Sequence, residues 1–217
     1  MRRKNKYIKK RKKNISLVTS WIFVLGLFMG VLRFGYKCYL QVKNNYQVEE
    51  YFKMINYRER DVLISLDDSV YENTIMLDDK RDYLGVLEVP KINLKRIFFD
   101  INSSENDVSK NLQLVKGSDM PSVKGGNVII AAHSGDSYVS YFKKIDELKM
   151  DDLAYVYYDN IKYTYKLFEK YEVLKNGKIK IKRNNEKNIL TLTTCNRMDE
   201  TKQMIYLFEL INEINLN

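Results

Sequence analysis

Two residues of this sequence combine a reactive side chain with a place at the end of an apolar run. His133 is the one histidine of the chain and follows the run 127–132, whereas Cys195 ends the run 188–195. The end of a rigid strand is a suitable mount for a catalytic group. A thiol near an imidazole forms a nucleophile with its proton-transfer partner. The pair therefore predicts nucleophilic catalysis by a cysteine.

The same two residues also permit a purely structural interpretation. A free cysteine is among the most buried residue types, and a lone histidine is commonly a satisfied core residue. A zinc site is disfavoured, because one histidine and one usable cysteine lack the paired spacing of zinc ligands. No metal is therefore predicted, and residue types alone leave the choice between catalyst and core open.

The segments around these residues have the texture of a β-rich domain. From residue 82 onward, short apolar or alternating runs recur between turn signals such as Asp159-Asn160 and Asn176-Gly177. Such spacing favours a closed β-barrel or a sandwich, with short helices expected at 107–115 and 137–145. We expect about eight strands, at 83–89, 97–101, 127–132, 153–157, 162–174, 178–182, 188–195 and 203–211.

The amino-terminal segment is strongly basic and then uncharged. Residues 1–13 hold nine Lys or Arg and no acid, and residues 15–32 carry no charge. Eighteen such residues are just long enough to cross a bilayer as a helix, and Arg33 and Lys37 can extend the reach. Because positive residues stay inside, the amino terminus is predicted to be cytoplasmic and the rest extracytoplasmic.

Two other interpretations of this segment are weaker. A buried core helix would not stand beside nine positive charges. A cleaved signal peptide needs a small-x-small site, which 32–36 does not offer, and Cys38 lacks the small residues that precede a lipoprotein cysteine. We therefore expect a basic cytoplasmic tail (1–14), an uncleaved transmembrane anchor (15–36), a helical stalk and linker (37–81), and a catalytic β-barrel (82–217).

Charge and cysteine content exclude several classes of protein. The chain has 37 Lys and Arg, 28 Asp and Glu, and a net charge of +9. Without the basic tail, 28 basic and 28 acidic residues remain. The folded part therefore has no excess of positive charge, which disfavours nucleic-acid binding, since that would need a charged face. Two cysteines do not make a disulfide scaffold. A bridge between Cys38 and Cys195 is improbable, because one lies at the membrane exit and the other near the end of the chain.

Three strings in order resemble one enzyme family. TLTTC (191–195) matches the TLxTC signature of sortases, the membrane-anchored cysteine transpeptidases of Gram-positive bacteria. AAHSG (131–135) resembles the histidine segment of the family, and YLGVLEVPKINL (83–94) resembles its domain opening. The resemblance covers about 82–217, and the anchor and stalk fit the amino-terminal plan of the family.

The resemblance implies a fold and a mechanism. The fold would be an eight-stranded closed β-barrel, all-β apart from short helices, behind a transmembrane helix and a helical stalk. Cys195 would attack the Thr carbonyl of an LPxTG-like sorting signal and form a thioester. His133 would protonate the leaving amine and deprotonate the incoming one. Surface proteins with sorting signals and a peptidoglycan precursor amine would be the partners, with no cofactor and with any calcium dependence open.

One position departs from the family pattern. Many sortases carry an Arg eight residues after the cysteine, where this chain has Gln203. A neutral amide can donate hydrogen bonds to an oxyanion but cannot supply a cationic fork. Either Gln203 does the work, or Arg197 reaches in from the loop, or the enzyme is weak or altered. A solvated loop charge is the plainer interpretation of Arg197.

Subtype and rival functions follow from smaller features. The sequence shows no second apolar span after the barrel region and no Asp-Pro-aromatic lid motif, which disfavours the pilin-polymerising class. A housekeeping-like or class-D-like enzyme is expected instead. An L,D-transpeptidase would place its cysteine beside Gly, and a papain-like protease would place Cys before His. A catalytically inactive, membrane-tethered binding module of the same fold stays open, because Gln203 replaces the usual Arg.

Overall fold

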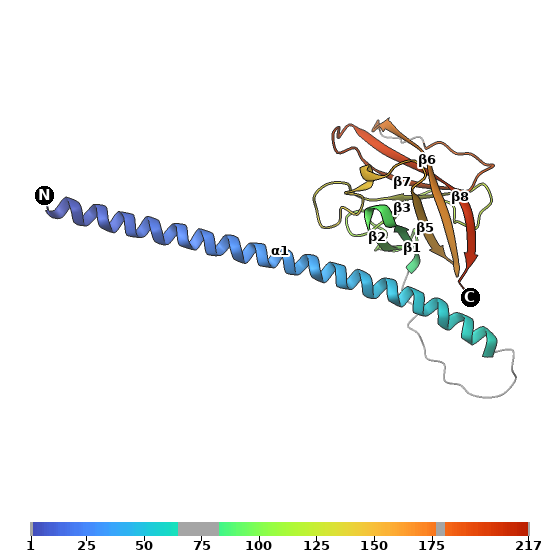
Figure 1. The fold of residues 1–217 in the computed structure, drawn as a ribbon, viewed down its shortest axis with the longest axis horizontal. Helices are drawn as coiled ribbons and strands as arrows, with labels where there is room; N and C mark the ends of the chain where they lie inside the picture. Colours follow the sequence, from blue (N-terminus) through green and yellow to red (C-terminus); the bar gives the residue numbers. More distant parts are fainter. Residues whose placement is uncertain (1, 65–82, 177–180, 217) are drawn as a thin grey trace. The chain divides into compact units, whose positions relative to one another are not determined.

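The computed structural model describes residues 2–64, 83–176 and 181–216, and places side chains over 19–55, 83–176 and 181–216. The chain forms two compact units, Met1–Lys43 and Asn44–Asn217. The long helix α1 (Arg2–Ile64) begins in the first unit and ends in the second (Figure 1). The second unit holds all the described strands.

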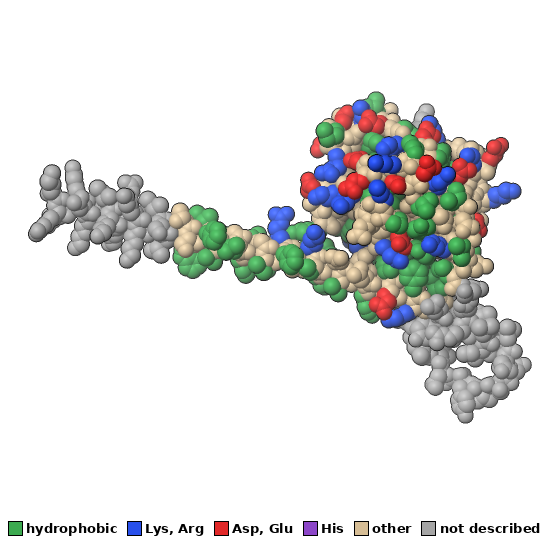
Figure 2. All heavy atoms as spheres, viewed as in Figure 1, with side chains coloured by type: hydrophobic (Ala, Val, Ile, Leu, Met, Phe, Trp, Pro, Cys, Tyr) green, Lys and Arg blue, Asp and Glu red, His purple; other side chains and the backbone are tan. Residues whose placement is uncertain are grey.

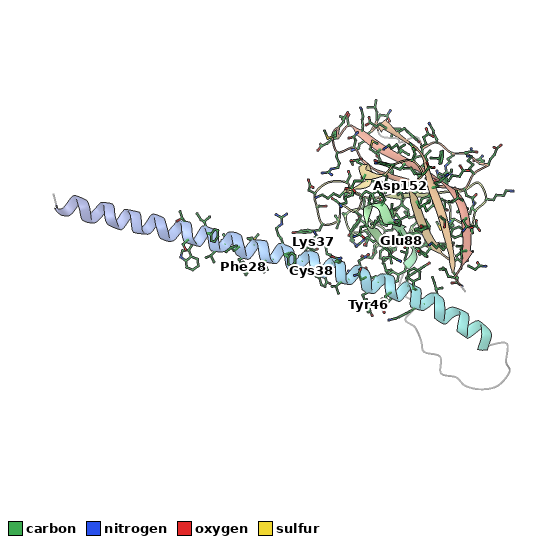
Figure 3. All side chains as sticks on the ribbon, viewed as in Figure 1. Phe28, Lys37, Cys38, Tyr46, Glu88 and Asp152 are labelled. Atoms are coloured by element: carbon green, nitrogen blue, oxygen red, sulfur yellow. The ribbon has the colours of Figure 1, made fainter. Side chains whose placement is uncertain are left out.

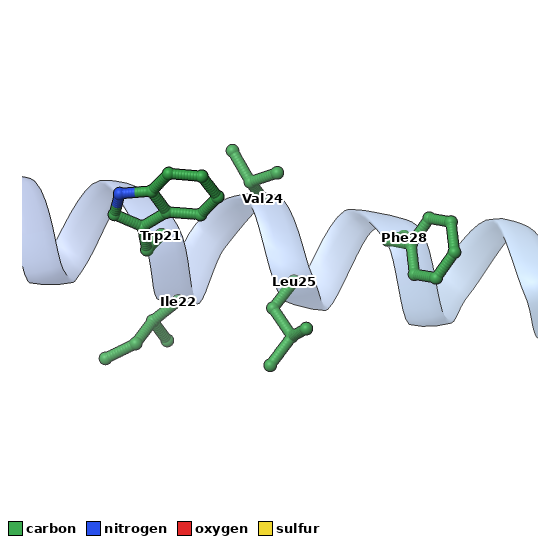
Figure 4. A pocket seen from close by; sticks show the side chains of 5 residues that line it. All are labelled: Trp21, Ile22, Val24, Leu25 and Phe28. Carbon is green, nitrogen blue, oxygen red and sulfur yellow. The ribbon is translucent and has the colours of Figure 1, made fainter.

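In the first unit, helix α1 presents apolar side chains to its surroundings. Trp21 is 72% exposed and Phe28 is 59% exposed, and Figure 4 shows both projecting from the helix with Ile22, Val24 and Leu25. Figure 2 shows green apolar side chains along this part of the helix, with tan backbone atoms between them. Apolar side chains without a protein core to cover them suit the interior of a bilayer. Among the described residues, one helix is long and apolar enough to cross a membrane.

The second unit is a nearly closed β-barrel, as the sequence predicts. Eight strands form one sheet in the order β2-β1-β5-β6-β8-β7-β4-β3, and a bridge between Phe98 and Leu112 joins its two edges. All neighbours pair antiparallel except β4 and β7, which run parallel. The strands are β1 (Tyr83–Val89), β2 (Leu94–Phe99), β3 (Gln113–Leu114), β4 (Asn127–Ala131), β5 (Leu153–Tyr158), β6 (Ile161–Leu174), β7 (Ile189–Cys195) and β8 (Lys202–Asn215).

The alternation of residues along the strands produces the barrel core. Strand β6 buries Tyr163, Tyr165 and Leu167 in the main cluster, while Lys162 and Lys166 on the opposite face are only partly buried. Side chains that point to one face repeat every second residue of a strand, so one register fills the interior. Burial raises the pKa of the Tyr165 hydroxyl, which is the expected effect of removing an ionisable group from water.

The opening of the barrel explains the string YLGVLEVPKINL. A Cβ at Gly85 would lie 2.5 Å from the Tyr157 carbonyl oxygen and 2.6 Å from the Phe98 ring, so a side chain does not fit there. Strand β1 stops at Pro90, which begins the 3₁₀ turn η1 (Pro90–Ile92). Asn93 then takes a left-handed conformation with φ 54°, which returns the chain as β2.

The end of α1 packs on the outer face of the barrel within the second unit. Val48 and Tyr51 are buried against Val86, Ile97 and Phe99. Residues before 82, where the barrel domain is predicted to begin, therefore also contribute to its packing. The predicted domain bounds at 14, 36 and 81 stay a prediction.

Polar and aromatic contacts fix this helix end in place. The Tyr51 hydroxyl donates to the Tyr157 carbonyl at 3.1 Å, and the Phe52 ring meets Tyr157 edge to face at 5.1 Å between centroids. On the same outer face, Glu88, labelled in Figure 3, accepts from the Tyr157 hydroxyl at 2.9 Å and pairs with Lys95 at 3.0 Å.

Two expected elements differ from the structure. Residues 107–115 form turns followed by β3, so the predicted helix there is wrong, and 137–145 form turns that lead into the 3₁₀ turn η2 (Ile145–Glu147). The predicted strand 178–182 lies mostly outside the described residues. Its last two residues, Ile181 and Lys182, are described and are not in a strand.

Candidate functional site

The two residues with nucleophilic chemistry lie at the ends of neighbouring parallel strands. In the β4–β7 ladder, Ala131 pairs with Thr193. Continuing this register by two residues places His133, which follows β4, opposite Cys195, the last residue of β7. Each strand is buried along most of its length and emerges at this end: His133 is half-buried and Cys195 is exposed. The ladder therefore brings together two residues that the sequence predicts to act as a pair.

Hydrogen bonds connect the two strand ends beyond the ladder. The Thr194 hydroxyl donates to the Ala132 carbonyl at 2.6 Å, and the Ser134 hydroxyl donates to the Cys195 carbonyl at 2.7 Å. Thr194 and Ser134 are each only 3% exposed. Buried hydroxyls that bond across the ladder hold the backbones of His133 and Cys195 at a fixed separation.

Gln203 lies directly across from Cys195 at the start of β8. The two residues are partners in the antiparallel β7–β8 ladder, so their side chains share one face of the sheet. The Gln203 amide Nε2 donates to the Thr193 hydroxyl at 2.6 Å, and that hydroxyl donates its own proton to the Met204 carbonyl at 3.2 Å. Because the Thr193 proton is committed, its lone pairs face the amide, and Nε2 is held at Thr193, two residues before Cys195 on β7.

Arg197 contacts the loop that follows His133. Its guanidinium donates to the Lys143 carbonyl at 3.1 Å and lies 3.7 Å from the Asp136 carboxylate. The pKa of Asp136 is lowered, first by the hydrogen bond and charge of Lys143 at 2.6 Å and then by the charge of Arg197. Arg197 thus links the loops that follow the two strand ends, through its contacts with Lys143 and Asp136.

A residue that sequence reasoning missed contacts the sulfur. Lys175 follows β6, and its ammonium Nζ lies 3.1 Å from Cys195 Sγ. The same Nζ donates to the Glu200 carbonyl at 2.9 Å. No local pattern marks this lysine, because it lies 20 residues before the cysteine in a loop. Its position near Cys195 follows only from the order of the strands in the sheet, in which β8 lies between β6 and β7.

The surroundings of His133 include a carboxylate. The pKa of Asp107 is lowered, mainly by hydrogen bonds from the backbone and side chain of Ser109, with smaller contributions from the charges of Lys110 and His133. A negative group thus lies within electrostatic range of the imidazole. Sequence reasoning missed this residue, because it assigned 107–115 to a helix.

The sequence also predicts no disulfide between the two cysteines and no metal site. Cys38 and Cys195 are both free and exposed, and Cys38 is labelled on α1 in Figure 3. Among the described residues, no group of three or more His, Cys, Asp or Glu side chains is arranged to hold a metal ion. The catalytic roles of His133, Cys195, Gln203 and Arg197 stay predictions.

The fold is a β-barrel that carries a histidine and a cysteine at the ends of two neighbouring parallel strands. Residues 87–209 match the family model described as the sortase domain. The chain belongs to the sortase family, whose members are in general cysteine transpeptidases. No curated protein matches the sequence.

Solved sortase structures share this fold. Sortase C1 of Streptococcus agalactiae is 24% identical, with a TM-score of 0.55 over 64% of this chain and 73% of that one. Sortase C-3 of Streptococcus pneumoniae is 22% identical, with a TM-score of 0.57 over 70% and 73% of the two chains. Sortase A of Listeria monocytogenes is 20% identical, with a TM-score of 0.53 over 63% and 92%. At these identities the likeness establishes the barrel, and the sortase class stays a prediction.

Proposed function

We propose that this protein is a membrane-anchored transpeptidase. It would cleave the LPxTG-like sorting signal of a substrate protein and join that substrate to an amine of the cell-wall peptidoglycan. The observation that supports the proposal is the parallel β4–β7 ladder of a sortase fold, whose last pair is Ala131 and Thr193; two more residues in the same register would set His133 opposite Cys195. The exposure of Cys195 supports it further, because a nucleophile must meet its substrate.

The first half of the reaction forms the thioester. The Cys195 thiolate attacks the Thr carbonyl carbon of the signal, and the negative charge moves to the carbonyl oxygen. As the tetrahedral species collapses, the C–N bond to the next residue breaks and His133 gives its proton to the leaving amine. The carboxyl-terminal fragment departs, and the acyl group stays on Sγ.

The second half transfers the acyl group. The acceptor amine attacks the thioester carbon, His133 takes the proton that this nitrogen loses, and the C–S bond breaks to return the Cys195 thiolate. The Gln203 amide lies across the ladder from Cys195 and bonds to Thr193, and its other N–H would donate to the carbonyl oxygen when that oxygen is negative. The apolar amino-terminal helix would keep the barrel at the extracytoplasmic surface of the cell membrane, where wall precursors and exported proteins meet.

The test uses the full-length protein in detergent with a panel of LPxTG-like peptides and triglycine as acceptor. Mass spectrometry should find the peptide cut after Thr and joined to triglycine. Cys195→Ala should reduce this to the background rate while the far-UV spectrum is retained, and Cys38→Ala should keep full activity. Turnover in Cys195→Ala would refute cysteine catalysis. Binding of a peptide without cleavage by the wild type would favour the inactive binding module.

A further inference from the structure

Lys175 is held against the nucleophile from two sides. Its backbone N–H donates to the Thr201 carbonyl at 2.8 Å, and its ammonium donates to the Glu200 carbonyl at 2.9 Å. Both acceptors belong to the turn between β7 and β8. These two bonds fix the start and the tip of the side chain, and the tip lies 3.1 Å from Cys195 Sγ. The contact is therefore built into the turn, unlike that of an unrestrained surface lysine.

The other charged groups around Cys195 are engaged elsewhere. Lys202 pairs with Glu172 at 3.0 Å and with Asp199 at 3.5 Å, and Glu172 also accepts from the Asn196 amide at 2.7 Å. Arg197 is bound to the loop after β4. Among the residues that the structure describes, Lys175 is the charged side chain for which a contact with the sulfur is found.

The chemistry of the contact favours one protonation state of the sulfur. A neutral thiol is a weak acceptor, whereas an ammonium has three donors and a full positive charge. Hydrogen bonds between ionised partners are about twice as strong as neutral ones. The ammonium thus gains most when the sulfur is negative. The position where the family pattern has a cation holds Gln203, which is neutral.

We propose that Lys175 is a catalytic residue that supplies the positive charge at the nucleophile. When the thiol proton passes from Cys195 to the His133 imidazole, the ammonium of Lys175 faces the new thiolate and stabilises it. The role in turnover rests on the proposed transpeptidase function, whereas the effect on the thiol does not. Lys175 directly follows β6, which pairs with β8, and so supplies a positive charge near Cys195 that the neutral Gln203 does not.

The experiment measures how fast iodoacetamide alkylates Cys195 as a function of pH. In this step the thiolate forms an S–C bond, the C–I bond breaks, and iodide leaves. The protein is the full chain carrying Cys38→Ala, so that one thiol reacts. Lys175→Met should lower the alkylation rate at pH 7 about tenfold and displace the rate profile to higher pH, the size expected for removing one opposite charge at this range. Lys175→Arg should stay near the parent.

Two further variants separate charge from structure. Lys175→Gln keeps N–H donors at the end of the side chain but removes the charge, so it should behave like Lys175→Met. Lys202→Met removes an equal charge nearby without the sulfur contact and should leave the profile unchanged. An unchanged profile in Lys175→Met, a parent-like Lys175→Gln, or an equal displacement in Lys202→Met would each overturn the proposal. A variant that unfolds is recognised by its far-UV spectrum, and Lys175→Arg against Lys175→Gln then decides.

Alkylation needs no peptide, so this proposal and the proposed function fail separately. A displaced profile with no peptide cleavage by the wild type would leave Lys175 in place and refute the transpeptidase. Peptide cleavage by the wild type, together with an unchanged alkylation profile in Lys175→Met, would support the transpeptidase and refute the role of Lys175. If both hold, the transpeptidation kcat of Lys175→Met at pH 7 should fall by about the same tenfold factor as its alkylation rate.

Discussion

Cys195 and Gln203 face each other across the β7–β8 ladder, and this pairing decides what the unusual glutamine can do. An amide nitrogen carries two N–H groups. One donates to the Thr193 hydroxyl, which leaves a second to meet an oxyanion formed at the strand end. The guanidinium of Arg197 instead holds the Lys143 carbonyl. The geometry thus favours Gln203 over Arg197 as the donor, as the sequence position also suggests.

The corresponding prediction compares two alanine variants. Gln203→Ala should lower kcat by roughly 10²–10³ with little change in KM, because an oxyanion donor acts mainly in the transition state. Arg197→Ala should change kcat less than Gln203→Ala. Steady-state cleavage of one sorting-signal peptide, measured for both variants, gives the answer. The reverse order would assign the role to Arg197, and full activity in both would leave backbone N–H groups as the stabilisers.

The sequence identifies a residue of this site only where that residue stands in a short recognisable motif. His133 and Cys195 stand in short patterns at the ends of apolar runs, so each could be found without a structure. Ser134 and Lys175 act through contacts with residues far away in the chain. Ser134 stands in the AAHSG string, but nothing there indicates its bond to the Cys195 carbonyl. The neighbourhood of Lys175 does not differ from an ordinary loop, so the sequence alone gives no signal for it.

At the scale of elements, alternation predicts long strands well and short irregular segments poorly. Strands β6 and β7 follow the expected pattern of buried residues. The expected helix at 107–115 fails because side chains satisfy the backbone there instead. Asn106 accepts from the Leu114 N–H at 2.7 Å and donates to the Leu114 carbonyl at 3.0 Å. Such local bonds compete with helical ones, and the segment becomes a turn followed by β3.

Part of α1 packs on the outer face of the barrel, although the sequence assigns this segment to a stalk. A stalk helix needs no buried stripe, yet Tyr51 is 5% exposed and bonds to the Tyr157 carbonyl. The spacing of apolar residues indicates the helix but does not say which of them are buried. Tyr46, labelled in Figure 3, is on the same helix and is 59% exposed.

Removing Tyr51 should therefore destabilise the barrel unit. Tyr51→Ala deletes a buried ring and should lower the free energy of unfolding by roughly 3 kcal/mol. Tyr51→Phe removes only the hydroxyl and should cost about 1 kcal/mol. Urea unfolding of the full chain in detergent, followed by far-UV circular dichroism, measures both. Tyr46→Ala is the matched control and should cost less than about 0.5 kcal/mol. Equal losses at Tyr46 and Tyr51 would show that the contact contributes nothing.

At the scale of the whole molecule, charge and hydropathy are separated along the chain. The nine basic residues of 1–13 are followed by an uncharged stretch, and the remainder of the chain is balanced in charge. This order, basic and then apolar, sets orientation in a bilayer, because lysine and arginine are retained on the cytoplasmic side. A catalytic unit after the span would then act outside the cell, where sorting signals of exported proteins are exposed.

The anchor prediction is that the intact chain stays in the membrane with its barrel outside. In a Gram-positive host, the full-length protein should remain in the pellet after alkaline carbonate extraction, and protease added to protoplasts should remove the barrel. Leu25→Lys puts a charge in the middle of the span, where insertion costs about 3 kcal/mol, and should release part of the protein from the pellet. Val42→Lys is the control on the same helix beyond the span and should stay bound. A soluble form that begins near residue 35 would show a cleaved signal peptide, and a barrel protected from protease would reverse the orientation.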